Sequence, residues 1–163
     1  MKFKKNLFLP FFLSIVSCVS FAQSSQFKEL LDDATHGDAD AQYNLGRMYD
    51  KGQGVAQNYT QAFEWFSKSA AQGNAKAQFN LAMMYLNGDG VTQSDTKAFE
   101  GLSKSAVQGD ASAQYNLGVM YQIGRGVTQS YVKAFEWYSK AAVQGNASAQ
   151  YNLGVMYQIG RGV

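Results

Sequence analysis

The chain has 163 residues, with 14 Lys and Arg against 12 Asp and Glu, a formal net charge of +2, and one Cys. A single Cys excludes an internal disulfide framework, so a packed core must hold the fold. Three of the 14 basic residues lie within the first five positions, and without them the balance is 11 to 12. This near-neutral charge excludes the basic footprint of a nucleic-acid-binding protein.

Residues 1–22 have the layout of a secretory signal peptide. Lysines come first, an apolar run follows over residues 7–19, and Ser20 and Ala22 place small side chains at −3 and −1 of a cut before Gln23. The run is short and contains a proline, so it does not predict a membrane span. We expect the mature chain to be exported, either to the periplasm or out of the cell.

Cys18 offers an alternative cut. Residues 15–18 loosely resemble the lipobox of bacterial lipoproteins, in which the cysteine becomes the lipidated first residue. The residues after Cys18 are still apolar, and Ile15 replaces the usual leucine, so we favour the cut after Ala22. A lipid anchor at Cys18 would tether the same domain to a membrane face.

Residues 23–40 form the next segment, and from residue 41 the chain repeats itself every 36 residues. A fixed period of this length is typical of solenoids, whose units stack because none can bury its apolar face alone. The predicted units are repeat 1 (41–76), repeat 2 (77–112), repeat 3 (113–148) and a partial repeat 4 (149–163).

Each unit predicts two helices. In the first, Ala41, Leu45, Met48 and Tyr49 form an apolar stripe at helical spacing, and the glycines of a G-x-G-V segment end the helix. The stripe of the second helix consists of Ala62, Phe63, Phe66 and Ala70 in repeat 1. Its N-caps are Asn58, Ser94 and Ser130, and its stops are Gly73, Gly109 and Gly145.

The segment before residue 41 aligns with the second helix of a unit. Phe27, Leu30 and Ala34 match Phe63, Phe66 and Ala70. We therefore expect a second-type helix over Ser24–His36 without its first-type partner, and eight alternating helices in all.

Three recurring motifs resemble those of the Sel-1-like repeat family, a relative of the tetratricopeptide repeats. They are L-G-x-x-Y, G-x-G-V and A-F-E-W…K-S-A-A-Q-G, which first occur at Leu45, Gly52 and Ala62. The resemblance implies an all-α solenoid of helix-turn-helix units wound into a right-handed superhelix. It also implies that first helices line the concave side, and that the protein binds a protein or peptide partner without catalysis.

Three positions of the first helix vary among the units and share one side of it, at i, i+3 and i+4. They are charged in repeat 1 and more apolar afterwards, which suggests a binding groove; the alternative is burial between units. Beside them runs an asparagine that either binds an extended peptide or bonds a neighbouring loop. Together we name these positions the inner face: Asn44, Arg47, Asp50, Lys51, Asn80, Met83, Leu86, Asn87, Asn116, Val119, Gln122 and Ile123.

No catalytic, cofactor-binding or metal-binding motif is apparent. His36 aligns with Gln72, Gln108 and Gln144, a polar helix-end position, and Asp38 precedes a helix as a capping residue would. Two S-x-x-K matches, at Ser94 and Ser130, fall where an N-cap is needed and lack the partner motifs of serine β-lactamases. The resemblance leaves one enzyme alternative, because some cysteine-rich Sel-1-like proteins are described as penicillin binders or β-lactamases.

Two departures from the pattern stand out. Gly101 replaces the tryptophan of the other units, Trp65 and Trp137, and predicts a local pocket, a flexible joint or simple decay of one copy. The helix of the partial repeat 4 keeps the interior pattern without a polar capping face. It predicts either fraying or docking onto a second copy, so a self-assembling structural repeat is a further alternative.

Overall fold

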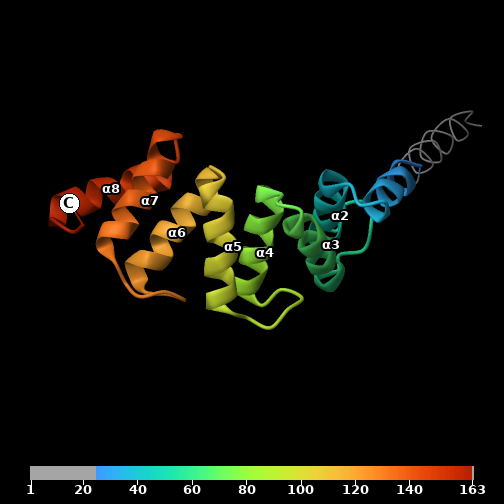
Figure 1. The fold of residues 1–163 in the computed structure, drawn as a ribbon, viewed down its shortest axis with the longest axis horizontal. Helices are drawn as coiled ribbons and strands as arrows, with labels where there is room; N and C mark the ends of the chain where they lie inside the picture. The colour runs from blue at the N-terminus through green and yellow to red at the C-terminus, as the bar shows by residue number, and fades with distance from the viewer. Residues whose placement is uncertain (1–24, 163) are drawn as a thin grey trace, which may run out of the picture.

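The computed structural model describes residues 25–162, and the expected signal peptide (residues 1–22) and Cys18 lie outside them. The described part is helical over residues 25–35 and then forms seven helices of 13 residues, with no strand between residues 25 and 162. The helices stack along one long axis, with the helix of residues 25–35 and α8 at opposite ends of the described part (Figure 1). This confirms the all-α solenoid and its eight alternating helices. The seven are α2 (Ala39–Lys51), α3 (Tyr59–Ala71), α4 (Ala75–Asn87), α5 (Asp95–Val107), α6 (Ala111–Ile123), α7 (Tyr131–Val143) and α8 (Ala147–Ile159).

Short polar side chains begin the helices, as the sequence predicts. Asn58, Ser94 and Ser130 each accept a hydrogen bond from the backbone N–H three residues on, at the N-termini of α3, α5 and α7. Asp38 does the same for Ala41 in α2, so its expected capping role is confirmed. Gly52 ends α2 in the left-handed conformation with φ of 66°.

The core is a row of linked clusters, each shared between neighbouring helices. One cluster places Ala98, Leu102 and Ala106 of α5 against Leu117 and Met120 of α6.

The predicted stripe of the second helix is shifted toward one side in the structure. In α3, Ala62 and Phe66 are buried as expected, but Trp65 and Ser69 are also buried, whereas Phe63 and Ala70 are only half-buried.

A ladder of buried glutamines ties the units together. Gln42, Gln78 and Gln114 are between 5 % and 8 % exposed, although they are polar. The Nε2 of Gln114 donates to the carbonyl of Ala106 at 3.1 Å, and its Oε1 accepts from Nε2 of Gln144 at 2.8 Å. Equivalent bonds link Gln42 with Ala34 and Gln72, and Gln78 with Ala70 and Gln108. The Gln72 position is the polar helix end that the sequence predicts, and it also joins neighbouring units.

In the loops after α4, α6 and α8, the second glycine of G-x-G-V lies against the start of the preceding second-type helix. A Cβ built on Gly90 would lie 2.5 Å from the carbonyl carbon and oxygen of Tyr59, and one built on Gly126 would overlap the carbonyl of Asp95. Only glycine permits so close an approach of two backbone segments. These loops are helix ends, as predicted, and they also join consecutive units.

The last helix, α8, spans Ala147–Ile159 and is capped by Asn146 and Gly160. Met156 is 2 % exposed, because α7 and the loop at Gly162 pack on it. Tyr157 is 64 % exposed. No helix within residues 25–162 has the length and apolar character that crossing a membrane requires.

Candidate functional site

The inner face is carried by α2, α4 and α6, which follow one another at the repeat spacing. In α2, three of its side chains, Asn44, Arg47 and Lys51, are exposed, and Asp50 is half-buried. Lys51 pairs with Asp50 at 3.0 Å, and the guanidinium of Arg47 lies 5.9 Å from the ring centre of Tyr43. The charged end of the face is therefore open to solvent.

A hollow of about 290 Å³ is lined by residues of α2, α3 and α4. Five residues of the inner face line it, two from α2 and three from α4: Asp50, Lys51, Asn80, Met83 and Asn87. The remaining walls are mainly aromatic and apolar, and the sequence did not single them out for this site: Tyr59, Phe66, Phe79, Met84 and Asp89. Charged and amide groups thus surround an apolar floor, which is the composition of many polypeptide-binding sites.

Further along the molecule the inner face is less open. Leu86 and Val119 are half-buried and pack against the core clusters, so the alternative of burial between units applies to them in part. Gln122 accepts a hydrogen bond from the hydroxyl of Tyr138 at 2.5 Å, which holds its amide toward α7. Ile123 is 59 % exposed and is the open apolar side chain of this region.

The asparagine row of the inner face does not act as a uniform ladder. Asn116 donates to the carbonyl of Ser112 in its own helix at 2.8 Å, rather than to a neighbouring loop. Asn152, the equivalent residue of α8, bonds the hydroxyl of Tyr138. The inter-unit ladder of this fold is made by glutamines, and the sequence signal for it was the recurrence of Gln42 and Gln72 at one fixed spacing.

Burial raises the pKa of Tyr138 to about 12, since this side chain is fully covered by α6, α7 and α8. The hydrogen bond from Asn152 acts in the opposite direction, and nearby Tyr115 raises the pKa further. Tyr138 is therefore a neutral hydrogen-bonding core residue at physiological pH, and it orients Gln122 on the inner face.

The S-x-x-K segments have a structural explanation. The hydroxyls of Ser94 and Ser130 accept from the backbone N–H groups of Lys97 and Lys133. The two lysine ammonium groups lie over the rings of Tyr85 and Tyr121, each 5.2 Å from the ring centre. These serines cap helices, as predicted.

His36 is exposed, and its Nδ1 lies 2.8 Å from the carbonyl oxygen of Asp32 in the helix that ends just before it. Across residues 25–162, no group of three or more His, Cys, Asp or Glu side chains could hold a metal ion.

The repeat pattern has a family counterpart. The Sel1 repeat family model matches residues 39–74, 75–110, 111–146 and 147–163. The chain belongs to the Sel1 repeat family. Sel1 repeat proteins generally mediate protein–protein interactions, and this scaffold is typically non-catalytic.

Solved structures of other Sel1-type proteins share the architecture of this Sel1 repeat chain. A Sel1 repeat protein from Oxalobacter formigenes is 40 % identical, with a TM-score of 0.74, and the match covers 79 % of this chain and 97 % of that protein. A protective antigen of uropathogenic Escherichia coli with an SLR fold is 37 % identical, with a TM-score of 0.79. That match covers 88 % of this chain but 34 % of the antigen, so the chain spans about a third of its length.

The cysteine-rich protein B of Helicobacter pylori has the same fold at 19 % identity, with a TM-score of 0.65 and coverage of 83 % of this chain and 97 % of that protein. Comparison with curated protein sequences gave no match.

Proposed function

We propose that this Sel1 repeat chain is a non-catalytic scaffold that binds a protein or peptide partner through its inner face. The observation that carries the proposal is the hollow between α2 and α4, in which side chains of two consecutive units surround one apolar floor. Because two units form the site, partner binding depends on the relative position of these units as well as on the side chains of the site.

The groups around the hollow suit an extended polypeptide. The amides of Asn80 and Asn87 can both donate and accept hydrogen bonds, as a peptide backbone requires. Lys51 and Asp50 add charges of both signs at one rim, and Phe79 and Met83 offer apolar contact.

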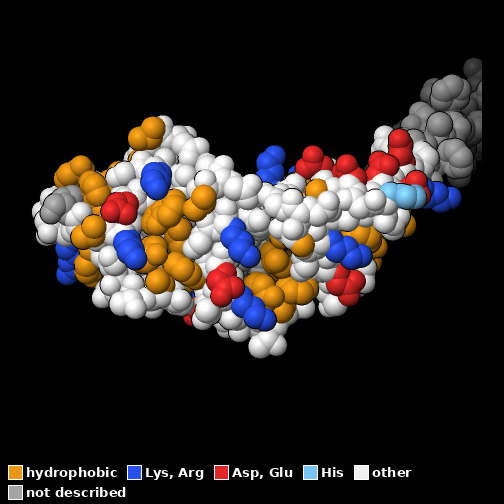
Figure 2. Space-filling view, viewed as in Figure 1, with side chains coloured by type: hydrophobic (Ala, Val, Ile, Leu, Met, Phe, Trp, Pro, Cys, Tyr) orange, Lys and Arg blue, Asp and Glu red, His pale blue; other side chains and the backbone are white. Residues whose placement is uncertain are grey.

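Six of the twelve acidic residues fall between residues 25 and 50. Most acidic side chains visible in Figure 2 accordingly gather at the N-terminal end.

The double variant Asn87→Arg with Ile123→Glu tests the inner face. Both side chains are exposed, so the substitutions should leave the helical circular dichroism unchanged while blocking the face. We expect a partner captured from the native cells by the wild-type protein, and quantified by mass spectrometry, to be lost from this variant.

The matched control places two charges elsewhere on the solenoid. Val107 and Val143, at the ends of α5 and α7, are 77 % and 90 % exposed, and Val107→Glu with Val143→Glu should retain the partner. Retention of the partner by the inner-face variant would contradict the proposal.

We further propose that the protein works in the bacterial envelope or outside the cell. The support is the arrangement of residues 1–22, with its lysines, apolar run and small residues before Gln23. The intact mass of the exported protein should correspond to a chain that begins at Gln23. A mass that corresponds to a chain beginning at a lipid-modified Cys18 would instead show that the protein is anchored to a membrane.

Self-assembly is a second candidate, favoured by the exposed aromatic and apolar side chains of α8. Tyr151, Tyr157 and Ile159 are 72 %, 64 % and 52 % exposed. Concentration-dependent light scattering of the pure protein, abolished by Tyr157→Lys, would support it, and a constant monomer mass would exclude it.

A further inference from the structure

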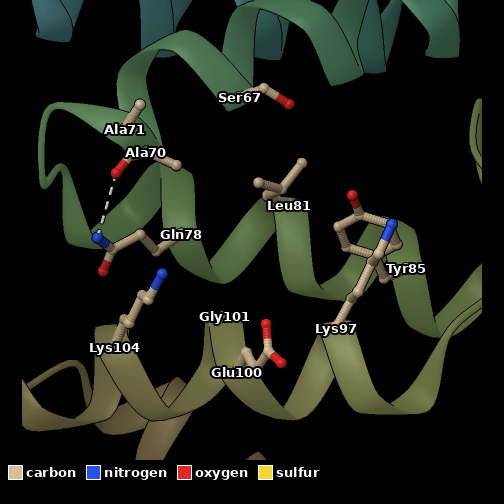
Figure 3. A pocket seen from close by; sticks show the side chains of 10 residues that line it. All are labelled: Ser67, Ala70, Ala71, Gln78, Leu81, Tyr85, Lys97, Glu100, Gly101 and Lys104. Atoms are coloured by element: carbon tan, nitrogen blue, oxygen red, sulfur yellow. Dashed lines mark hydrogen bonds between the residues drawn. The ribbon is translucent and has the colours of Figure 1, made fainter.

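A second hollow, of about 350 Å³, lies between α3, α4 and α5 beside Gly101 (Figure 3). Gly101 occupies the position that Trp65 and Trp137 hold in the neighbouring repeats. α5 runs unbroken over Asp95–Val107, so the glycine produces a pocket rather than a joint in the helix.

The walls of this hollow are those that surround an indole elsewhere in the molecule. Trp65 shares its core cluster with Leu31, Ala34, Leu45 and Tyr49. The residues 36 positions further on all line the hollow: Ser67, Ala70, Leu81 and Tyr85. Trp137 packs on the corresponding cluster of the next unit, which contains Ala106, Leu117 and Tyr121. The fold therefore builds the same site three times and fills it from within twice.

A lysine covers the site in all three repeats. The ammonium of Lys68 lies 4.0 Å from the ring centre of Trp65, and that of Lys140 lies 4.1 Å from the ring centre of Trp137. Lys104 holds the same position relative to Gly101 and lines the hollow, where Figure 3 shows its side chain directed toward the space between α5 and α4. A cation at this place favours the face of an aromatic ring.

The packing around Gly101 keeps the hollow open. A Cβ at position 101 would lie 3.0 Å from the Cβ of Ala82, so a side chain there would press against α4. In repeats 1 and 3 the residue equivalent to Ala82 is glycine, because a Cβ on Gly46 would lie 2.7 Å from Phe66 and one on Gly118 would lie 2.6 Å from Tyr138. Repeat 2 has the smaller Leu102 at that aromatic position and thus has room for the methyl group of Ala82. Two matched changes accompany Gly101, which is not the pattern of a copy that has simply decayed.

We propose that the hollow at Gly101 is a binding site for a tryptophan side chain of a polypeptide partner. The indole would lie against Leu81, Tyr85 and Ala70, with the ammonium of Lys104 over its face. The partner supplies in trans the ring that repeats 1 and 3 carry in cis. The residues of α4 that line this site differ from those of the inner face. The two proposals can therefore be tested, and refuted, independently of each other.

The openness of the hollow favours a polypeptide over a free indole compound. Lys97, Glu100 and Lys104 stand at its edge rather than closing it, so a small free ligand would stay partly in water. A tryptophan within a chain adds contacts around the pocket, and tryptophan anchors carry much of the binding energy in protein interfaces. The two lysines against one glutamate favour acidic residues on either side of the tryptophan.

The test is calorimetric titration of the protein with a capped pentapeptide of sequence Gly-Asp-Trp-Asp-Gly, compared with the same peptide carrying Ala for Trp and with free indole. We expect binding of the Trp peptide, no binding of the Ala peptide, and at least tenfold weaker binding of indole. Absence of Trp-peptide binding, or equal affinity for free indole, would overturn the proposal.

Variants locate the binding. Gly101→Trp combined with Ala82→Gly should fill the hollow, raise Tm and reduce peptide affinity at least tenfold, with Ala82→Gly alone as its control. Lys104→Ala should weaken the peptide severalfold. The matched Lys68→Ala and Lys140→Ala variants, whose ammonium groups cover internal indoles, should leave peptide affinity unchanged. Equal effects of all three lysine variants, with the protein folded, would refute a site at Gly101.

Discussion

The amide of each buried glutamine holds three segments of chain together. Gln114 of α6 bonds the carbonyl of Ala106 at the end of α5 and the side chain of Gln144 beyond the end of α7. Gln144 also donates to the carbonyl of Gly109 at 3.0 Å. A buried amide contributes most when all its partners are satisfied, and its loss leaves polar groups without them.

We predict that Gln114→Ala lowers the free energy of unfolding by about 1–3 kcal/mol, since the carbonyl of Ala106 loses its buried donor. Gln150 is the matched control, because it makes the same bond to Ala142 at 3.1 Å in an exposed setting. Gln150→Ala should lower the free energy of unfolding by no more than about 0.5–1 kcal/mol. Urea denaturation of both variants measures the difference, and equal losses would show that the ladder adds nothing by being buried.

Tyr138 links stability to alkaline pH. Its pKa in the folded chain is about 12, above the value of 10.0 expected when the chain is unfolded. The unfolded state therefore loses the phenolic proton first, so this contribution is intact below pH 10 and is lost as the pH rises toward 12.

We predict that the free energy of unfolding of the wild-type protein falls by about 2 kcal/mol more than that of Tyr138→Phe over this range. Phenylalanine fits the site, because Phe66 holds the same place in repeat 1. Denaturation curves at pH 9 to 12 give the comparison, and parallel curves for the two proteins would contradict the raised pKa.

Each second-type helix begins under the loop of the following unit. Backbone of this loop reaches Tyr59 at Gly90 and Asp95 at Gly126. Arg125, beside Gly126, adds an ion pair with Asp95 at 2.8 Å. The loops thus act as clamps between units as well as helix ends.

Gly126→Ala should destabilise the protein by more than about 2 kcal/mol, because a methyl group there adds a collision with Asp95 to the strain of a φ of +68°. Gly109 is the control. Its φ is +97°, but nothing lies within 4 Å of a built Cβ, so Gly109→Ala should cost only the conformational term of about 1–2 kcal/mol. Chemical denaturation distinguishes the two, and equal costs would show that the contact with Asp95 is easily relaxed.

The elements themselves could be predicted from the sequence, because caps, glycines and apolar spacing are local signals repeated at one period. Asp38, Ser94 and Ser130 illustrate this, since their capping roles depend on neighbours three residues away. The pairing of Gln114 with Gln144 depends on residues 30 positions apart whose polarity suggests exposure. At Gly101 the sequence predicted a pocket, a flexible joint or decay of one copy, and the matched residues Ala82 and Leu102 became visible only through packing.

At the scale of the whole molecule, each unit contacts its neighbours along one axis (Figure 1). The spacing of the variable positions assigned the inner face to first-type helices, and its residues lie on α2, α4 and α6. Its openness could not be predicted from this spacing, because half-burial of Leu86 and Val119 depends on how consecutive units are rotated. That the chain binds a partner is a prediction about the whole molecule, because the hollow between α2 and α4 is formed by two consecutive units.

The glutamine pairs and loop glycines make the junctions between units interchangeable. A second copy of residues 111–146 inserted after residue 146 would meet, at both of its ends, the contacts that the present units already make. The reach of the molecule can therefore lengthen or shorten by whole units at little thermodynamic penalty. The hollow at Gly101 would keep its distance from the N-terminal end through such changes. The length of the solenoid can thus change while the position of this hollow relative to the N-terminal units stays the same.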